Sequence, residues 1–329
     1  MAEDYINELD DSLDDIEPVE RTSELYEHFR VVVDKGQTPV RIDKYLFERI
    51  VNASRNRIQT AADAGFVMAN GKPVKSSYKV KPLDVLTVMM DRPRYENDII
   101  PEDIPLDILY EDDDLLVVNK PKGMVVHPSA GHYSGTLVNA IMYHCKDSLS
   151  GINGEIRPGI VHRIDMDTTG SLIVCKNDES HVFIAEQIKE HSVNRRYRGI
   201  VYGVVRDDEG TIHAPIGRHP VDRKKMAINE KNGKDAITHY KVLERFDKYT
   251  YMEFKLETGR THQIRVHMAS IGHPLLGDTL YSNGKSPYKL QGQTLHAMTI
   301  GFIHPRTREY MEISAPLPEY FEKILRDLR

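Results

Sequence analysis

The sequence of 329 residues is poor in cysteine, has no tryptophan and contains no long apolar run. Its two cysteines, Cys145 and Cys175, are too few for a disulfide scaffold or a cysteine-rich zinc module, so both classes are excluded. No apolar stretch approaches the roughly 18 residues that a membrane-spanning helix needs, which excludes an integral membrane protein. The length predicts about two domains at roughly 150 residues each. We therefore expect a cytoplasmic globular protein.

Basic residues are absent from the first 20 positions, which hold nine acidic residues instead. This segment lacks the basic and apolar regions of a signal peptide, and we expect a disordered acidic tail over residues 1–25. The formal net charge of −6 is misleading because of this tail. Without residues 1–20, the chain has 44 basic against 41 acidic residues.

Residues 41–92 have the pattern of a small α/β module. Apolar residues four positions apart predict a helix over 42–50, and a second helix is predicted between Ser54 as N-cap and Gly65 as its stop. The dipeptide Asn70-Gly71 between short apolar runs predicts a hairpin, because both turn residues tolerate a positive φ. A last strand is predicted at 84–88.

This module is locally basic, with ten basic against five acidic residues over 41–92. A solvated surface would explain such a run, but the local excess favours a phosphate-binding face. The residues expected on that face are Arg41, Lys44, Arg55, Arg57, Lys72 and Lys75. The stretches Arg41-Ile-Asp-Lys-Tyr-Leu46, Ser54-Arg55 and Gly65-Phe-Val-Met-Ala-Asn-Gly-Lys72 resemble an S4 RNA-binding domain, which we expect at 28–92. A proline-containing linker is predicted at 93–105.

The remaining residues, 106–329, are expected to form an α+β domain. Strands are predicted at 107–111, 115–119, 159–165, 171–175, 197–205, 236–244 and 250–258, with a helix through Leu137, Ala140 and Ile141. In the last strand, Met252, Phe254 and Leu256 alternate with charged residues, as in a half-buried strand. Neighbouring strands joined by turns favour a mostly antiparallel mixed β-sheet with flanking helices.

The densest group of reactive side chains lies in Arg157-Pro-Gly-Ile-Val-His-Arg-Ile-Asp-Met-Asp-Thr-Thr-Gly170. The predicted strand places His162, Arg163, Asp165 and Asp167 near a strand end, followed by a turn at 168–170. Catalysis is one interpretation of these residues. The other is structural, with Asp165 capping the turn and pairing with Arg163. The residues alone favour neither.

Two other clusters contain arginines. In the first, Thr258-Gly-Arg-Thr-His-Gln-Ile-Arg-Val-His267, a helix is predicted over 263–270, and Arg265 in its first turn could pair with a carboxylate such as Asp165. The second, Arg195-Arg-Tyr-Arg198, offers phosphate contacts beside a stacking ring. A basic loop at 218–225 has the composition of a solvated loop.

The fifteen histidines raise the question of a metal site. A metal-dependent hydrolase using His162, Asp165 and His262 is an alternative. However, the sequence has no H-E-x-x-H motif and no cysteine cluster. We therefore expect no metal.

From about residue 28 to 325, the sequence resembles the RluA-type pseudouridine synthases. The most specific stretch is His162-Arg163-Ile164-Asp165 followed by Thr168-Thr169-Gly170, with Ile164 where leucine is usual and Met166 where a basic residue is common. Other matching stretches are Asn119-Lys-Pro-Lys-Gly123, His127-Pro128, Arg196-Tyr197, Thr258-Gly-Arg-Thr-His-Gln-Ile-Arg265 and His273-Pro-Leu-Leu-Gly-Asp278. With an S4-like module before this core, and with Arg157-Pro-Gly-Ile-Val-His162 and Arg218-His-Pro220, the sequence resembles the large-subunit ribosomal members most closely.

The resemblance implies an isomerase that converts uridine in RNA to pseudouridine without a cofactor. It implies that Asp165 is the catalytic carboxylate, that Tyr197 stacks on the flipped uracil, and that Arg265 pairs with Asp165. Arg163 would fill the gap left by the base. The neighbouring His162, Arg196 and Arg260 are expected to contact RNA or help flip the base.

The expected partner is a stem-loop of large-subunit rRNA, free or within a pre-ribosomal particle, and the expected state is a monomer. Transfer RNA is an alternative substrate. A different class of function is a non-catalytic RNA-binding or ribosome-assembly factor with an S4 domain. Turnover would distinguish an enzyme from that factor.

Overall fold

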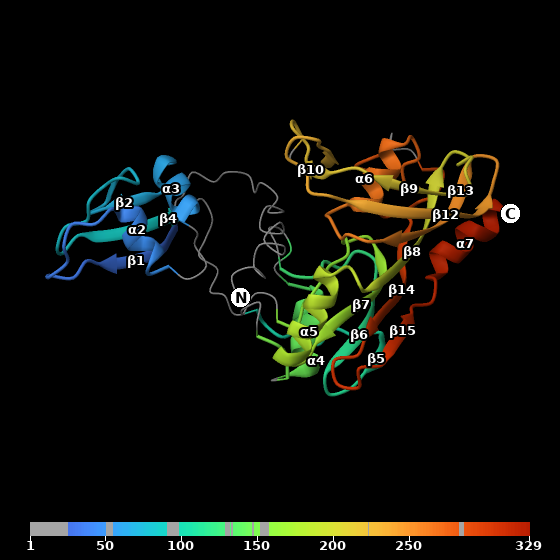
Figure 1. Ribbon diagram of the computed structural model, residues 1–329, viewed down its shortest axis with the longest axis horizontal. Helices are drawn as coiled ribbons and strands as arrows, with labels where there is room; N and C mark the ends of the chain where they lie inside the picture. The colour runs from blue at the N-terminus through green and yellow to red at the C-terminus, as the bar shows by residue number, and fades with distance from the viewer. Residues whose placement is uncertain are drawn as a thin grey trace. The chain divides into compact units, whose positions relative to one another are not determined.

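The computed structural model describes residues 26–50, 55–90, 99–128, 132, 134–146, 148–151, 158–222, 224–282 and 286–329. Several predictions fall outside these residues: the acidic tail at 1–25, the Ser54 cap, the first part of the linker at 93–98, Arg157, and Arg223 of the basic loop. The side chain of Arg57 is also outside them. The chain divides into two compact units, one within 18–98 and one beginning at residue 99 (Figure 1).

The N-terminal unit is a small sheet with two helices. Its elements are β1 (Tyr26–Val32), α2 (Ile42–Phe47), α3 (Arg55–Asp63), β2 (Val67–Ala69), β3 (Lys72–Pro73) and β4 (Val85–Met90). The strands pair antiparallel in the order β1-β4-β2-β3. Ile42, Leu46 and Ile58 are buried against Val67 and Leu86, so the helices cover one face of the sheet.

The predicted hairpin is confirmed. Asn70 and Gly71 have φ of 52° and 76° between β2 and β3, as a tight turn with two left-handed residues requires. Strand β1 was not predicted. It is an edge strand whose exposed and half-buried residues do not alternate strictly, because His28 and Phe29 are both half-buried at a shift in register. Its polar side chains give it little apolar periodicity.

The C-terminal unit is built on one large sheet. Its first elements are β5 (Ile108–Glu111), β6 (Leu115–Lys120), α4 (Leu137–Cys145), β7 (Thr169–Cys175), α5 (Asp178–Lys189) and β8 (Asn194–Tyr202). Then come β9 (Glu209–His213), β10 (Ile216–Arg218), β11 (Met226–Ile228), β12 (Ile237–Arg245), β13 (Tyr249–Leu256) and α6 (Gln263–Ser270). The last elements are β14 (Leu295–Ile303), β15 (Tyr310–Ser314) and α7 (Glu319–Leu328).

The nine-stranded sheet has the order β5-β6-β7-β14-β8-β13-β12-β9, and β15 also pairs with β14. Its described pairs are antiparallel except for β7 and β14, which run parallel. The predicted mostly antiparallel mixed sheet is therefore confirmed. A separate hairpin is formed by β10 and β11.

Helices cover both faces of this sheet (Figure 1). In β6, alternate residues pack toward different helices: Leu116 lies in one apolar cluster with Leu137 of α4, and Leu115 lies in another with Ile184 of α5. In the β8 and β13 region, α7 packs through Phe321 on Ile200. The other face of these strands carries a further set of buried side chains, among them Tyr197 and Phe254. None of the described helices is long and apolar enough to cross a membrane.

Two local predictions near Asp165 were wrong. Residues 161–165 are not a strand; only Ile160 makes an isolated bridge, to Val174. The turn lies at 165–168 rather than 168–170, because Thr168 donates its backbone N–H to the carbonyl of Asp165 at 3.0 Å and Thr169 already begins β7. The apolar run that suggested a strand is nevertheless buried, because irregular chain can also fill a core when its backbone groups find partners.

Candidate active site

Asp165 lies in the turn that leads into β7. The turn is held from outside by Lys120, whose buried ammonium donates to the carbonyls of Met166 (2.9 Å), Pro121 (2.9 Å) and Met124 (2.7 Å). Gly123 also donates its N–H to Met166 at 3.0 Å. The segment that contains the matched Asn-Lys-Pro-Lys-Gly stretch therefore fixes the backbone beside Asp165.

The Asp165 carboxylate is paired with Arg265. Nη1 of Arg265 donates to Oδ2 of Asp165 at 3.1 Å. The remaining side of the guanidinium forms a two-pronged pair with Asp278, with Nε to Oδ2 at 2.7 Å and Nη2 to Oδ1 at 3.0 Å. Asp278 is fully buried, whereas the Asp165 side chain is 18% exposed. Asp278 thus orients Arg265, and Arg265 presents one N–H to a carboxylate that solvent and ligands can reach.

Arg265 is in position because α6 begins at a sharp bend. His262, the N-cap, has the left-handed φ of 56°, and its ring Nδ1 hydrogen-bonds the hydroxyl of Tyr281 at 2.8 Å. Gln263 fixes the preceding loop, since its Oε1 accepts from the Thr258 hydroxyl at 2.8 Å and from the Arg260 N–H at 2.9 Å. The predicted helix over 263–270, with Arg265 in its first turn, is confirmed.

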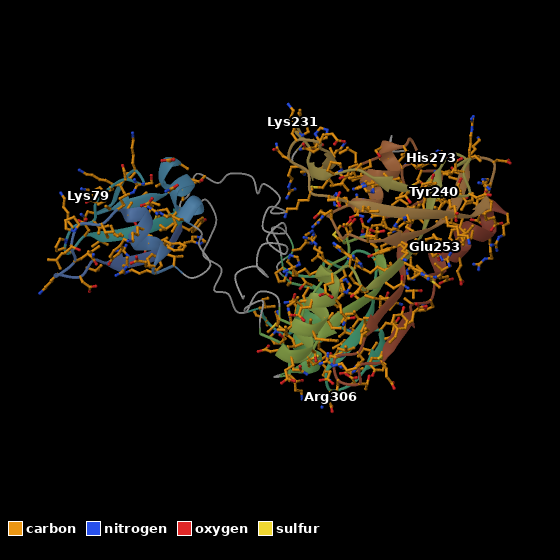
Figure 2. All side chains as sticks on the ribbon, in the orientation of Figure 1. Lys79, Lys231, Tyr240, Glu253, His273 and Arg306 are labelled. Carbon is orange, nitrogen blue, oxygen red and sulfur yellow. The ribbon has the colours of Figure 1, made fainter. Side chains whose placement is uncertain are left out.

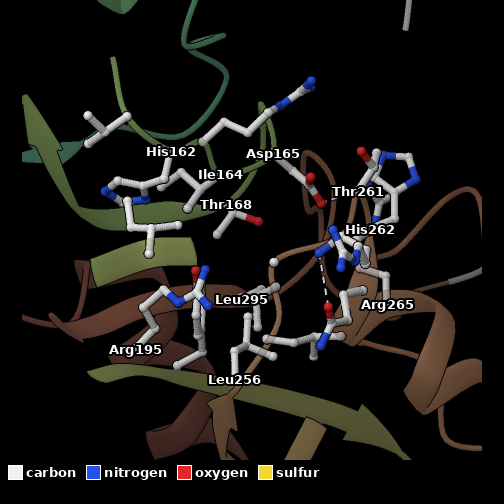
Figure 3. Close-up of a pocket in the computed structure, with 18 of the residues that line it drawn as sticks. His162, Ile164, Asp165, Thr168, Arg195, Leu256, Thr261, His262, Arg265 and Leu295 are labelled. Carbon is white, nitrogen blue, oxygen red and sulfur yellow. Dashed lines mark hydrogen bonds and ion pairs between the residues drawn. The ribbon is translucent and has the colours of Figure 1, made fainter. Parts of the chain in front are cut away.

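A pocket of about 190 Å³ opens between this pair and the sheet (Figure 3). Asp165, His262 and Arg265 line one side, and Arg195 and Tyr197 of β8 line the sheet side. Apolar side chains complete the wall: Ile160, Ile164, Leu256 and Leu295. The pocket thus combines a carboxylate, an aromatic ring and an apolar wall, the composition expected of a site for a planar ring attached to a polar chain.

Opposing influences set the ionisation of Asp165. Burial alone would raise its pKa, but the charges of His262 and Arg265, with the hydrogen bond from Arg265, outweigh burial and hold the pKa below its usual value. Asp165 is therefore a carboxylate at neutral pH. Burial raises the pKa of Tyr197, so its phenol is protonated there.

The predicted RNA-contacting residues separate in space. Arg163, which is exposed, Arg260, which is half-buried, and His162 line the pocket. Arg196 does not: it is exposed on β8 between two residues that face the pocket. Successive side chains of a strand point to opposite faces of the sheet, so Arg196 points away from the pocket that its neighbours Arg195 and Tyr197 line. The sequence prediction did not take this alternation into account.

His162 has a structural contact at the pocket wall. Its Nε2 accepts the backbone N–H of Ile173 at 2.9 Å. Burial and the charge of Arg195 lower its pKa to about 3, so the ring is neutral. A nitrogen that accepts this hydrogen bond has no lone pair left for a metal.

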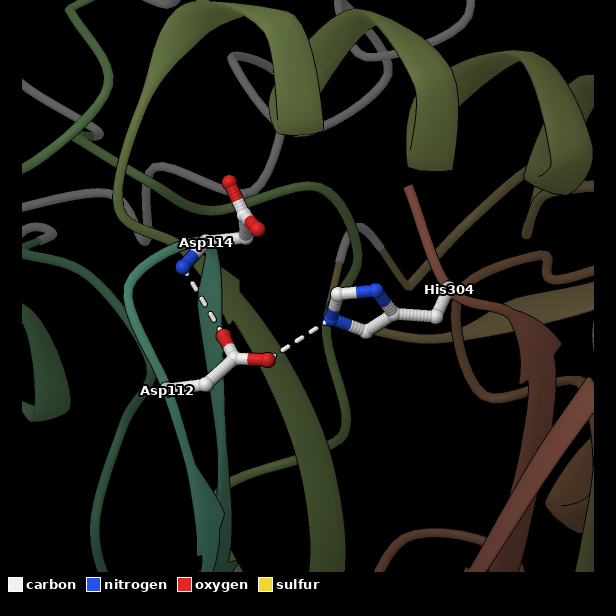
Figure 4. A group of neighbouring side chains, drawn as sticks. All are labelled: Asp112, Asp114 and His304. Atoms are coloured by element: carbon white, nitrogen blue, oxygen red, sulfur yellow. Dashed lines mark hydrogen bonds and ion pairs between the residues drawn. The ribbon is translucent and has the colours of Figure 1, made fainter. Parts of the chain in front are cut away.

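The described residues contain one group of three side chains close enough to share a metal ion, and it lies elsewhere. It comprises Asp112, Asp114 and His304 (Figure 4). Internal contacts account for it, since His304 hydrogen-bonds Asp112 at 2.7 Å and Arg306 forms a two-pronged pair with Asp114. The alternative hydrolase site of His162, Asp165 and His262 is not such a group within the described ranges.

The basic residues of the N-terminal unit lie mostly on its surface, as Lys79 does in Figure 2. Lys44, Lys72 and Lys75 are exposed. Arg41 and Arg55 are also about half exposed, but both pair with the buried carboxylate of Asp43, at 2.9 Å and 3.4 Å. Asp43 thereby orients two of the predicted phosphate contacts.

Three residues of the site were not assigned this part from the sequence: Lys120, Asp278 and Arg195, the last of which was predicted only as one of three arginines that offer phosphate contacts. The first two belong to stretches that resemble the family, which was the available signal. Their contacts join residues far apart in the chain, so no local pattern reveals them.

Comparison with known proteins agrees with this geometry. The profile described as "RNA pseudouridylate synthase" matches residues 114–270, and the S4 domain profile matches residues 40–86. The chain is 50% identical over 299 residues to the uncharacterized RNA pseudouridine synthase YlyB of Bacillus subtilis (strain 168), covering 91% of this chain and 97% of that protein. The chain belongs to the RNA pseudouridylate synthase family.

Other members of this family are also similar. Identity is 46% over 298 residues to the ribosomal large subunit pseudouridine synthase D of Zymomonas mobilis, covering 88% of this chain and 93% of that protein. The solved structure of human RNA pseudouridylate synthase domain containing 1 has a TM-score of 0.54 and 25% identity, covering 69% of this chain and 96% of that chain. The predicted family, the S4 domain ahead of a synthase core, and an RNA-directed isomerase activity are confirmed.

Proposed function

We propose that this pseudouridine synthase acts on large-subunit rRNA and that Asp165 is its catalytic carboxylate. The observation that supports this proposal most directly is that an ionised Asp165, paired with Arg265 at 3.1 Å, lies at the wall of a pocket that Tyr197 also lines. We assign residues 28–92 to the S4-like RNA-binding domain and 106–329 to the catalytic domain.

Isomerisation of uridine replaces the bond from C1′ of ribose to N1 of uracil by a bond from C1′ to C5. Asp165 supplies the electron pair in one of two ways: it attacks C1′, or it removes the C2′ proton to give a glycal. Both routes need a carboxylate that is ionised and held in place. Arg265 and, through it, Asp278 meet that need. No oxidation state changes and no group leaves the RNA, so we propose that no cofactor takes part.

Tyr197 is assigned to the target base. Its ring lies on the pocket side of β8, where it can stack on a uracil turned out of the RNA. Because its phenol is protonated at neutral pH, the hydroxyl acts in removal of the C5 proton only by passing its own proton on. Arg163 at the exposed rim is assigned to the gap that the base leaves.

The choice of rRNA rests on two observations. The Zymomonas mobilis relative is named for the large ribosomal subunit, and the N-terminal unit carries exposed Lys44, Lys72 and Lys75. A stem-loop offers the phosphates that such a face binds. We propose that the chain acts as a cytoplasmic monomer on free rRNA or on an assembling particle. Arg196 and Arg260 remain proposed RNA contacts.

The decisive test is mapping of pseudouridine by carbodiimide treatment and primer extension. The substrates are large-subunit rRNA, tRNA transcripts and a pre-ribosomal particle. Asp165→Asn should abolish turnover while RNA affinity stays within about twofold, because the carboxylate acts in chemistry. Asp167→Asn is the matched control in the same turn and should retain turnover.

Primer-extension stops mark pseudouridines. Stops on rRNA that appear with the wild type and not with Asp165→Asn support the proposal. Stops on tRNA alone contradict the rRNA assignment, and substantial turnover by Asp165→Asn contradicts the catalytic assignment. RNA binding without turnover on any substrate would indicate the non-catalytic assembly factor instead.

A further inference from the structure

Arg195 is a buried cation that the mechanism above does not use. It is only 7% exposed, yet within the described part of the chain its guanidinium has one hydrogen bond, from Nη2 to the carbonyl of Glu257 at 2.9 Å. Its Nε is buried without an acceptor. A guanidinium has five N–H donors, so Arg195 keeps donors at the pocket wall that a ligand entering the pocket can pair with.

The surroundings of Arg195 provide no carboxylate partner among the described residues. Burial lowers the pKa of Arg195, the neighbouring Tyr197 raises it, and Arg260, another cation, lowers it. Room for the guanidinium is made by Gly259, where a Cβ would lie 2.6 Å from Nη1 of Arg195. The chain thus keeps an uncompensated positive charge at the pocket wall and accommodates it with a residue that lacks a side chain.

Position in the pocket indicates which part of an RNA substrate reaches this charge. Arg195 and Tyr197 are two residues apart on β8, face the same pocket and are each 7% exposed. Figure 3 shows Arg195 across the pocket from Asp165 and Arg265. The phosphates of a bound RNA belong to its backbone, which would pass the rim of the pocket, where Arg163 is exposed. The group that penetrates to the buried sheet side, beside the stacking ring, is the base.

We infer that Arg195 donates a hydrogen bond to a carbonyl oxygen of the target uracil and holds the base while it is detached from the ribose. This assignment rests on the proposed function. When the C1′–N1 bond breaks, its electron pair stays on N1 and is shared with O2 and O4 of the ring. A fixed cation beside one of these oxygens stabilises that charge and keeps the uracil in place until C5 bonds to C1′.

The first test uses small ligands, so it does not depend on knowing the RNA substrate. Binding of free uracil and of ribose 5-phosphate to the full-length protein is measured by NMR titration. Arg195→Met should weaken uracil binding roughly 10- to 100-fold, as for loss of a hydrogen bond to a charged group, and leave ribose 5-phosphate binding unchanged. Arg198→Met is the matched control; Arg198 lies on the same strand and pairs with Glu253 at 3.0 Å.

The second test measures single-turnover rates on RNA whose target uridine is replaced by 2-thiouridine or 4-thiouridine. Sulfur is a weaker acceptor than oxygen, so the wild type should slow with one of the two analogues. In Arg195→Met the same substitution should have little further effect, and this non-additivity identifies the contact. A wild type without turnover would contradict the proposed function, whereas the uracil titration still tests Arg195.

Three results would overturn the inference. One is loss of ribose 5-phosphate binding with uracil binding intact in Arg195→Met, which indicates a phosphate site. Another is absence of Arg195-dependent uracil binding up to the solubility of uracil, and a third is strict additivity with both thio analogues. Thermal unfolding separates a structural role: Arg195→Met should keep or raise the midpoint, because the methionine removes an unpaired buried charge, and a marked fall would indicate a structural brace instead.

Discussion

At the scale of single residues, the ionisation of Asp165 depends on partners from two other segments. Burial of Asp165 favours the neutral acid, and Arg265 with His262 reverses that preference. Asp278 holds Arg265 by two hydrogen bonds, so a fully buried carboxylate controls the charge of a partly exposed one. The pKa of Asp165, and thus its activity at low pH, is set by residues about 100 positions away.

A pH profile tests this dependence. In the wild type the pKa of Asp165 is below about 3.9, so its carboxylate persists, and its ion pair stabilises the fold, at pH values above that. The carboxylate and the stabilisation by its ion pair are lost only as pH falls through the pKa that Asp165 has in the folded protein. Replacing Arg265 by Met and Asp278 by Asn together removes the cation that lowers the pKa of Asp165, so the effect of burial, which raises this pKa, is opposed less. The acid limb of the single-turnover rate should then move up by about 1 to 3 pH units. Coincident acid limbs in the wild type and the double variant would refute the role of Arg265.

The hydroxyl of Tyr197 can be tested separately from its ring. Tyr197→Phe keeps the ring, so RNA affinity should be unchanged, while the rate should fall about 100-fold or more if the hydroxyl helps to remove the C5 proton. RNA deuterated at C5 of the target should then show an isotope effect that the wild type lacks. A Phe variant as fast as the wild type would leave Tyr197 with stacking alone.

At the scale of elements, the Asp165 turn and the start of β7 form one unit. Gly170 has a φ of 110°, and a Cβ there would lie 2.2 Å from the backbone oxygen of Ala297 in β14. Glycine is therefore required for the parallel contact of β7 with β14, which lies five residues after Asp165. The glycine of the matched Thr-Gly pair is therefore explained by packing rather than by chemistry.

Gly170→Ala should destabilise the catalytic unit by more than backbone strain alone. Gly272→Ala is the control, because Gly272 has a φ of 83° and a Cβ at that position would meet no atom within 4 Å. Gly272→Ala should lower the free energy of unfolding by about 1 kcal/mol because alanine is strained in the left-handed conformation. Gly170→Ala should lower it by about 1–3 kcal/mol more because its Cβ also overlaps the β14 backbone. Urea unfolding measures both free energies, and equal costs would contradict the close approach.

The elements were predictable to different degrees. The period-two pattern of β13 and the helix that carries Arg265 follow from local periodicity, and both are present with nearly the predicted bounds. Residues 159–165 were predicted as a strand because they are apolar, but hydrogen bonds from Lys120 and Gly123 hold the following turn in irregular chain. Those donors come from about 40 residues away, so the sequence window around Asp165 contains no sign of them.

At the scale of the whole molecule, binding and chemistry are assigned to different units. The S4-like unit presents exposed lysines, and the synthase unit contains the pocket. Changes in the first unit should therefore alter RNA affinity and its salt dependence without altering the rate of the bound complex.

Charge reversal in the S4-like unit tests this division. Lys72→Glu with Lys75→Glu should weaken RNA binding and reduce the slope of log affinity against log salt by about 1 to 2. The single-turnover rate at saturating protein should stay the same. The control is Lys323→Glu with Arg326→Glu on α7, which packs away from the pocket face of β8 and should leave the slope unchanged. A loss of rate in the saturated lysine variant would show that the units are not independent.

The sequence by itself determined the class of sheet, the S4 hairpin, the helix that carries Arg265 and the family resemblance, because these depend on local periodicity, turn chemistry and short motifs. Tertiary structure alone decided that Asp278 orients Arg265, that Lys120 fixes the Asp165 turn, that Arg196 lies away from the pocket and that Arg195 faces it with most of its donors unused. The physical reason is that charge compensation and hydrogen-bond satisfaction are settled between side chains brought together from distant segments, and a sequence pattern records which groups are present but not which of them meet.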